Sequence, residues 1–256
     1  MTLTKLRRTS YVALFLGLIW VASSATDFSL WRAITAIPEV VMWLINNMVP
    51  TASALEKLPR IIDKLVETIL MSIMASMTAA VFSFIFAIMG AKTTGHNQFL
   101  AGISRIAASL GRNIPVAAWA MIFLLSFGQS SFTGFLALFF ASFGFLTRAF
   151  MDSIDANADL TAEALRATGA SYSHVISQAV VPGSLPQMLS WVLFVIETNI
   201  RSATLVGLLT GSGIGFMFSV YYKSLQYSSA ALVIIAIVAV VLSIEIISNT
   251  LRRIIL

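Results

Sequence analysis

Six stretches of this chain are long enough to form a membrane-spanning helix and contain no charged side chain. About 20 consecutive apolar residues cross the hydrocarbon core of a bilayer as a helix. Charged residues make up 11% of the chain and hydrophobic residues 58%, whereas soluble domains have about 25% and 45–50%. We therefore expect an all-α polytopic membrane protein with about six transmembrane helices. The uncharged windows cover residues 9–26, 68–91, 113–147, 167–196, 202–222 and 224–244.

Turn residues and charges divide these windows into individual spans. Residues 1–60 are expected to hold the first span and then an extracytoplasmic or interfacial segment, with an interfacial helix at Val40–Val49. Residues 61–256 form the core, which leaves no room for a separate catalytic domain. The segment 202–222 is rich in glycine and is expected to be a broken or re-entrant element, although a further span stays open. The six spans are placed at 11–25, 61–90, 114–127, 132–150, 185–207 and 229–249.

Charge and residue usage exclude several classes of function. The net charge of +5 is scattered along the chain, which argues against nucleic-acid binding. Zero cysteines and two histidines leave no basis for a thiolate or histidine-rich metal centre. The phosphate-loop pattern G-x-x-x-x-G-K-[ST] does not occur, so the chain is not expected to hydrolyse ATP alone. With a cytoplasmic N-terminus most Lys and Arg lie inside, which places both termini and residues 152–178 in the cytoplasm.

The longest polar stretch of the second half predicts a short cytoplasmic helix at about 159–168. Asp159 is a suitable N-cap, Glu163 lies near the positive end of the helix, and Gly169 can end it in a left-handed conformation. A helix this short is not stable alone in water. We therefore expect it to dock into a groove on a partner protein.

A second polar group falls inside the fifth span. Glu197 and Arg201 are four residues apart, so they share a helix face and can pair. Arg201 also offers the positive charge that an anion needs along its route, and polar side chains follow it. Contact with substrate and a purely structural ion pair both stay open. We predict a translocation path or gate formed by Glu197, Asn199, Arg201, Ser202, Thr204, Gly211, Gly213 and Gly215.

The order Glu163-Ala164, four residues, Gly169, and later Pro182 resembles the EAA loop of bacterial ABC importer permeases. The run from Glu197 to Gly215 is similar to the fifth-span signature of phosphonate-type permeases in that family. The resemblance covers about residues 67–256. It implies that a separate ATPase subunit grips the loop at about 152–182, through Glu163, Ala164, Leu165, Arg166, Gly169, Ala170 and Pro182.

What the resemblance implies is a type I, MetI-like permease subunit in the bacterial cytoplasmic membrane. It would form the path for phosphonate or a related oxyanion such as phosphite, hypophosphite or a phosphate ester. Its partners would be a second permease subunit, identical or related, two ATPase subunits that bind ATP and Mg, an extracytoplasmic binding protein and the lipid bilayer. No cofactor is expected in this chain. An ABC permease for an amino acid such as methionine is the main alternative, and an ion-coupled secondary transporter is a further one.

Overall fold

The computed structural model describes residues 2–26 and 28–255, and every regular element in these ranges is a helix. The chain divides into two units, residues 1–49 and residues 50–256. The first unit contains α1 (Thr2–Ala25) and α2 (Leu30–Asn47). The apolar part of α1, Ser10–Ala25, is shorter than the four long candidate spans of the second unit.

Helix α2 is longer than the interfacial helix predicted at Val40–Val49. It starts ten residues earlier, where the Ser29 hydroxyl accepts a hydrogen bond from the N–H of Arg32. Pro38 lies inside the helix and lacks the N–H that would bond to the preceding turn. The predicted helix begins after this proline, at Val40, whereas the observed helix runs through it.

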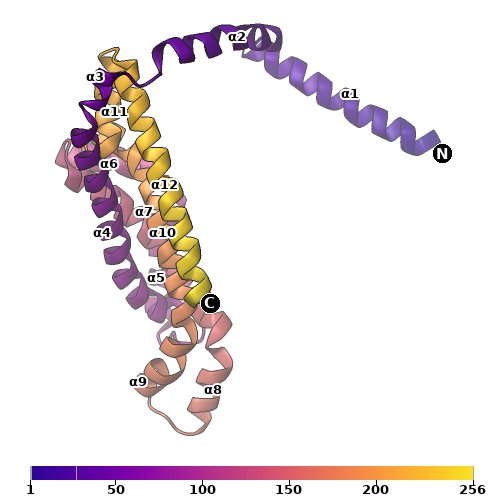
Figure 1. Ribbon diagram of the computed structural model, residues 1–256. Helices are drawn as coiled ribbons and strands as arrows, with labels where there is room; N and C mark the ends of the chain where they lie inside the picture. Colours follow the sequence, from indigo (N-terminus) through magenta and orange to yellow (C-terminus); the bar gives the residue numbers. More distant parts are fainter. Residues whose placement is uncertain (1, 27, 256) are drawn as a thin grey trace. The chain divides into compact units, whose positions relative to one another are not determined.

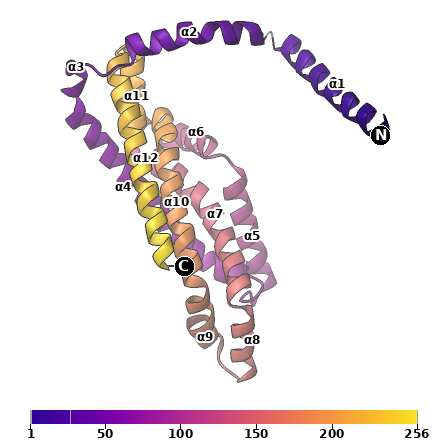
Figure 2. The same cartoon turned by 45° about the vertical axis from the view of Figure 1, so that its right-hand side comes forward.

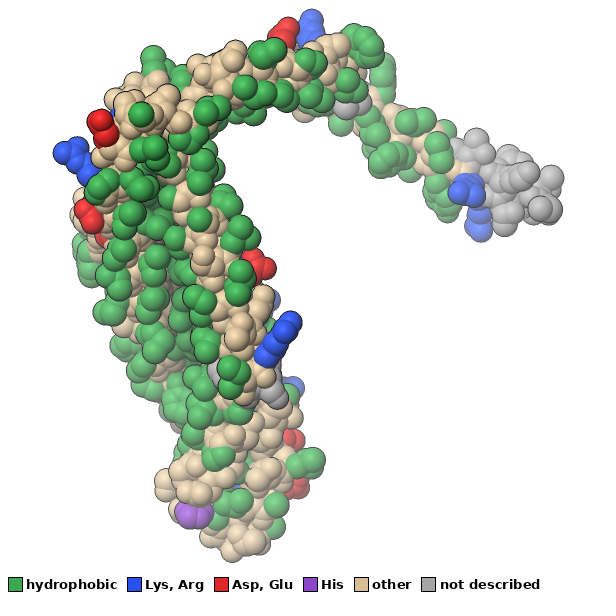
Figure 3. Space-filling view, in the orientation of Figure 1, with side chains coloured by type: hydrophobic (Ala, Val, Ile, Leu, Met, Phe, Trp, Pro, Cys, Tyr) green, Lys and Arg blue, Asp and Glu red, His purple; other side chains and the backbone are tan. Residues whose placement is uncertain are grey.

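Four helices of the second unit are long and apolar enough to cross a bilayer (Figure 1). They are α4 (Leu58–Gly90), α7 (Ser131–Asn157), the continuous run Tyr172–Thr210 that ends in α10 (Val181–Thr210), and α12 (Tyr227–Ile255). These helices correspond to the second, fourth, fifth and sixth predicted spans. Hydrophobic side chains cover much of the face of this unit shown in Figure 3, away from the end that carries α8 and α9, as is typical of a surface that faces lipid.

The third predicted span, at 114–127, is only part of a bent pair. Helix α5 (Gln98–Asn113) and helix α6 (Val116–Phe127) meet at an angle of 95°. Pro115 lies at the break and favours an extended residue before it. Twelve helical residues rise only about 18 Å, so α6 cannot cross a bilayer by itself. Helix α5, whose buried small residues recur three or four positions apart, was not predicted.

The remaining short elements lie at opposite ends of the bundle. Helices α3 (Ala52–Leu55) and α11 (Gly213–Lys223) lie at one end, and α8 (Asp159–Ala167) and α9 (Tyr172–Val175) lie at the other (Figures 1 and 2). The π-helix η1 (Ile176–Val180) joins α9 to α10. Helix α11 has 11 residues, too few to cross a bilayer, which favours the broken element over a further span.

Small residues let the central helices pack closely. Helices α4 and α7 form the most extensive contact, and α10 packs against both. The buried face of α4 consists largely of alanine and serine, as is common where membrane helices meet. Between α5 and α7 the contact is closer still, because a Cβ on Gly144 would lie 2.3 Å from the carbonyl carbon of Gly111. The buried small residues of α4 include Ser72, Ala75, Ser76, Ala79, Ser83 and Ala87.

Candidate functional site

Helix α8 projects from one end of the bundle and has two different faces. Ala162 is fully buried, whereas Leu160 keeps 82% of its surface exposed. The other predicted coupling residues of this helix lie mostly on the exposed side: Glu163, Ala164 and Arg166 are exposed and Leu165 is half-buried. Leu160 therefore adds an apolar side chain to the exposed face of a nine-residue helix that is too short to be stable alone in water.

Gly169 ends α8 in the left-handed conformation that the sequence predicted, with φ +81°. The N–H of Ala170 donates to the carbonyl of Leu165, and that of Gly169 to the carbonyl of Arg166. Open space surrounds the position where a Cβ of Gly169 would lie, so backbone conformation alone selects glycine here. The predicted N-cap was one residue off. Ala158 occupies the N-cap position without a side-chain hydrogen bond, and Asp159 is the first helical residue.

The turn after α4 holds α8 and α9 in place. Arg166 donates to the carbonyl of Thr93, and the Tyr172 hydroxyl donates to the carbonyl of Thr94 at 3.0 Å. The Thr93 hydroxyl lies 3.0 Å from a carboxylate oxygen of Asp155 and 3.1 Å from one of Asp159. The sequence prediction missed this support, since Thr93 and Arg166 are 73 positions apart. Both aspartates therefore bind the turn after α4 through the Thr93 hydroxyl.

Pro182 is the second residue of α10, and because α10 continues the helical run from Tyr172, its missing N–H leaves one bond to the preceding turn unmade. The π-helix η1 precedes it and was not predicted. Gly183 follows, and a Cβ there would lie 3.2 Å from the carbonyl oxygen of Asn157, at the end of α7. The segment that contains α8 and α9 therefore begins and ends at the same place, where the end of α7 contacts the start of α10.

In the middle of α10, the Glu197 carboxylate binds two arginines. It lies 3.1 Å from Arg201 of the same helix and 2.6 Å from Arg252 of α12. Arg252 also donates to the hydroxyl of Ser248 at 2.8 Å. Glu197 is buried, whereas the Arg201 side chain is 45% exposed. The predicted pairing of Glu197 with Arg201 is thus confirmed. Arg252, which lies near the C-terminal end of the sequence, is a second cation that binds the same carboxylate.

Asn199 points to a different set of neighbours. Its amide nitrogen donates to Ser76 of α4 at 2.9 Å and to Ser142 of α7 at 2.6 Å. Asn199 is buried, so these bonds satisfy a polar group that would otherwise be costly inside the bundle. Asn199 therefore joins three helices, and it does not face the same surroundings as Arg201.

The remaining predicted gate residues lie in the last turns of α10 and at the start of α11. Ser202 is half-buried, and the buried hydroxyl of Thr204 has no hydrogen-bond partner among the described residues. Gly215 packs against the same turn, because a Cβ there would lie 2.0 Å from the carbonyl oxygen of Thr204. The helix break at Gly211 and Gly213 uses positive φ angles of +68° and +58°.

Two residues of α4 hold the start of α11. The Glu67 carboxylate accepts hydrogen bonds from the Ser131 hydroxyl at 2.6 Å and from the N–H of Gly213 at 3.3 Å. The Thr68 hydroxyl accepts from the N–H of Ile214 at 2.8 Å. These two N–H groups would have no partner within the helix, so α4 caps α11 from outside. The sequence prediction did not include Glu67 or Thr68.

Comparison with known proteins supports this arrangement of elements. Residues 79–256 match the family described as binding-protein-dependent transport system inner membrane component. The phosphite transport system permease protein PtxC of Stutzerimonas stutzeri is 30% identical over 192 residues, which cover 75% of this chain and 70% of that protein. The phosphate-import permease protein PhnE of Mycolicibacterium smegmatis is 28% identical over 239 residues, 91% of this chain and 44% of that protein.

A solved structure has the same fold. The crystal structure of an amino acid ABC transporter with histidines aligns with a TM-score of 0.65, covering 80% of this chain and 99% of that chain at 16% identity. The long apolar helices and the family match together make this chain a multi-pass permease subunit of the inner membrane. The chain belongs to the family of binding-protein-dependent transport system inner membrane components.

Proposed function

We propose that this chain forms the translocation path of an ATP-driven importer for a phosphorus oxyanion, such as phosphonate, phosphite, hypophosphite or a phosphate ester. The proposal of ATP coupling rests on α8, a nine-residue helix that is too short to be stable alone in water and that exposes Leu160, Glu163 and Ala164. The choice of cargo is supported by the relatives that are named as phosphite and phosphate-import permeases.

The partner of α8 in this proposal is a separate ATPase subunit that binds ATP and Mg. Glu163, Ala164 and Arg166 present the contact surface, and Gly169 and Ala170 set the direction of the chain as it leaves the helix. Movement of the ATPases would pull on α8, and the bonds from Arg166 and Tyr172 to the turn at 93–94 would carry that movement to α4 and α5.

The complete importer would contain two permease subunits, two ATPase subunits and an extracytoplasmic binding protein. In this arrangement α8 and both termini lie in the cytoplasm, and α11 faces the binding protein. Hydrolysis of ATP belongs to the ATPase subunits and not to this chain.

Arg201 is the residue that we assign to the cargo. Its side chain is 45% exposed even while it contacts Glu197, and one carboxylate facing two arginines leaves a net charge of +1. An exposed guanidinium can form paired hydrogen bonds to a phosphorus oxyanion. Glu197 would weaken this attraction enough for the anion to move on.

An amino acid importer is the second candidate, because a solved amino acid transporter shares the fold. Uptake competition separates the two. Cells that depend on this system for phosphorus should take up labelled phosphite, and unlabelled phosphite, methylphosphonate or hypophosphite should compete. Competition by methionine and not by any phosphorus oxyanion would overturn the proposed cargo.

A second experiment tests the ATPase partner. The tagged chain should retain a nucleotide-binding subunit when it is purified in mild detergent, and Glu163→Arg should release that subunit. Glu56→Arg is the matched control, since Glu56 is equally exposed but lies at the opposite end of the bundle. Retention of the ATPase by the Glu163 variant would argue against α8 as the contact.

A further inference from the structure

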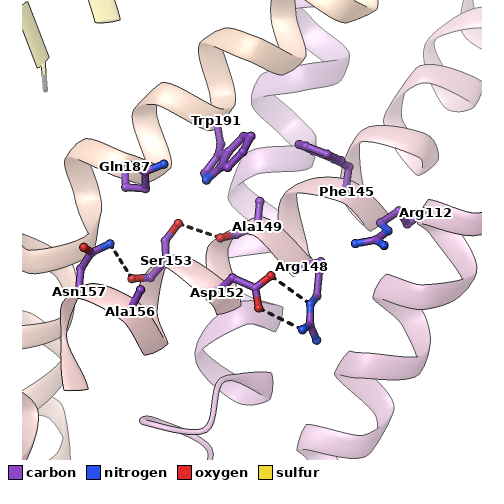
Figure 4. A pocket seen from close by; sticks show the side chains of 10 residues that line it. All are labelled: Arg112, Phe145, Arg148, Ala149, Asp152, Ser153, Ala156, Asn157, Gln187 and Trp191. Carbon is purple, nitrogen blue, oxygen red and sulfur yellow. Dashed lines mark hydrogen bonds and ion pairs between the residues drawn. The ribbon is translucent and has the colours of Figure 1, made fainter. Parts of the chain in front are cut away.

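A cationic groove lies between α5, α7 and α10, on the half of the bundle nearer α8 (Figure 4). One chamber has a volume of about 450 Å³ and an adjoining chamber has about 320 Å³. Arg112 of α5 and Arg148 of α7 line both chambers, and Trp191 of α10 lines the larger one. None of these residues takes part in the α8 contacts or in the Glu197 cluster described above.

The groove carries an excess of positive charge. Together with a third chamber that shares Arg148, its lining has four cations, Lys92, Arg105, Arg112 and Arg148, and two carboxylates, Asp152 and Asp155. The formal net charge of the lining is therefore +2.

Asp152 is already paired with Arg148 at 3.1 Å, and Asp155 accepts N–H bonds from the turn after α4. Arg112 forms no ion pair with any residue that the structure describes. Arg112 is exposed, so its guanidinium is available to an anion from outside the chain.

An aromatic wall stands beside these cations. The rings of Phe145 and Trp191 meet edge to face at 5.7 Å, and Ala149 continues the apolar surface. A free inorganic anion makes no use of such a wall. A phosphodiester that carries an acyl chain uses both parts, because its phosphate can bind guanidinium groups while its glycerol and first methylenes lie against the rings.

We propose that this groove binds the head group of an anionic phospholipid, with the phosphate between Arg112 and Arg148 and the chain against Trp191. The site lies where transmembrane helices reach the end that carries α8, so the lipid comes from the leaflet on that side. Basic pockets between helices at this depth are suited to lipid phosphates. The proposal does not depend on which cargo the importer carries.

The test uses the assembled transporter, purified through a tag on this chain and placed in nanodiscs. Phosphatidylglycerol with brominated acyl chains should quench tryptophan fluorescence at a lower mole fraction than brominated phosphatidylcholine does. Trp191→Phe should remove this difference. Arg112→Gln should weaken the preference for phosphatidylglycerol roughly fivefold, and Arg112→Gln with Arg148→Gln roughly thirtyfold.

Arg253→Gln is the matched control, because it removes an exposed cation of α12 that does not line the groove. If the double variant fails to fold, the single Arg112 variant decides, since it breaks no ion pair within the described residues. Equal quenching by both lipids in the unmodified transporter would overturn the proposal. It would also be overturned if inorganic phosphate, without phosphatidylglycerol, stabilised the protein in an Arg112-dependent way, because the site would then hold a free oxyanion.

Discussion

The Glu197 carboxylate lies 2.6 Å from the Arg252 guanidinium, although 55 positions separate the two residues in the chain. This ion pair joins the middle of α10 to the last turns of α12, and its carboxylate is buried. Because Glu197 also contacts Arg201, its charge is shared between a partner that is largely buried and one that is exposed. The two arginines should therefore behave differently when each is replaced.

Arg252→Gln should destabilise the subunit. Removing one member of a buried pair leaves the other charge poorly compensated, and we expect a loss of roughly 1–3 kcal/mol in unfolding free energy. Thermal unfolding of the purified transporter measures this change. The double variant Glu197→Gln, Arg252→Gln removes both charges of this pair. Its loss of unfolding free energy should therefore be smaller than the sum of the losses in the two single variants. Simple additivity would show that the pair is not coupled.

Arg201→Ala should affect transport more than stability, since its side chain is 45% exposed. We expect uptake of the oxyanion to fall by about tenfold or more, the loss of roughly one charge-assisted hydrogen bond. The same variant is also purified in mild detergent, and the amount of ATPase that it retains should equal that of the unmodified chain. Arg201→Lys keeps the charge and should retain part of the activity. A variant that fails to accumulate would instead identify Arg201 as a structural residue.

Gly169→Val should uncouple the importer. Its φ of +81° is unfavourable for any residue with a Cβ, at a cost of roughly 1–2 kcal/mol, so the exit from α8 should shift. Gly128→Val is a control for backbone strain, because Gly128 has φ +71° and equally open surroundings but follows α6. Its ψ of −172° lies in a region that essentially only glycine adopts, so this variant should be strained at least as much as the Gly169 variant. Only the Gly169 variant should lose the ATPase during purification, and equal losses would contradict the coupling role of the α8 exit.

Tyr172→Phe should weaken the connection between the loop and the turn after α4. It removes one hydrogen bond of 3.0 Å to the carbonyl of Thr94, worth about 1 kcal/mol. We expect the amount of cargo moved per ATP hydrolysed to fall by up to about fivefold, while the ATPase stays bound. Tyr222→Phe, at an exposed position of α11, should have no effect. An unchanged ratio in the Tyr172 variant would show that this bond does not transmit movement.

Features carried by neighbouring residues could be predicted from the sequence. The apolar windows placed α4, α7, α10 and α12, and the spacing of Glu163 and Gly169 located the end of α8. Glu197 and Arg201 were paired correctly because one helical turn brings them together. The bend before α6 could have been read from Ile114-Pro115, but the uncharged window around it concealed the break.

Contacts between distant parts of the chain left no such signal. Nothing in the local sequence around Thr93 indicates that it would bind Arg166, and a terminal Arg252 is more typical of a membrane-flanking anchor than of an intramembrane partner. Helix α5 was missed because polar residues share its sequence with buried small ones, so hydropathy alone does not reveal it.

The contact between Gly111 and Gly144 determines how α5 and α7 can move. Their backbones touch directly, and a slide of one helical turn, about 5.4 Å, would bring Phe140 or Arg148 to the place where Gly144 now lies. Neither side chain fits there. The two helices are therefore locked in register and must rotate or tilt as one rigid lever, whatever force reaches them from either side of the membrane.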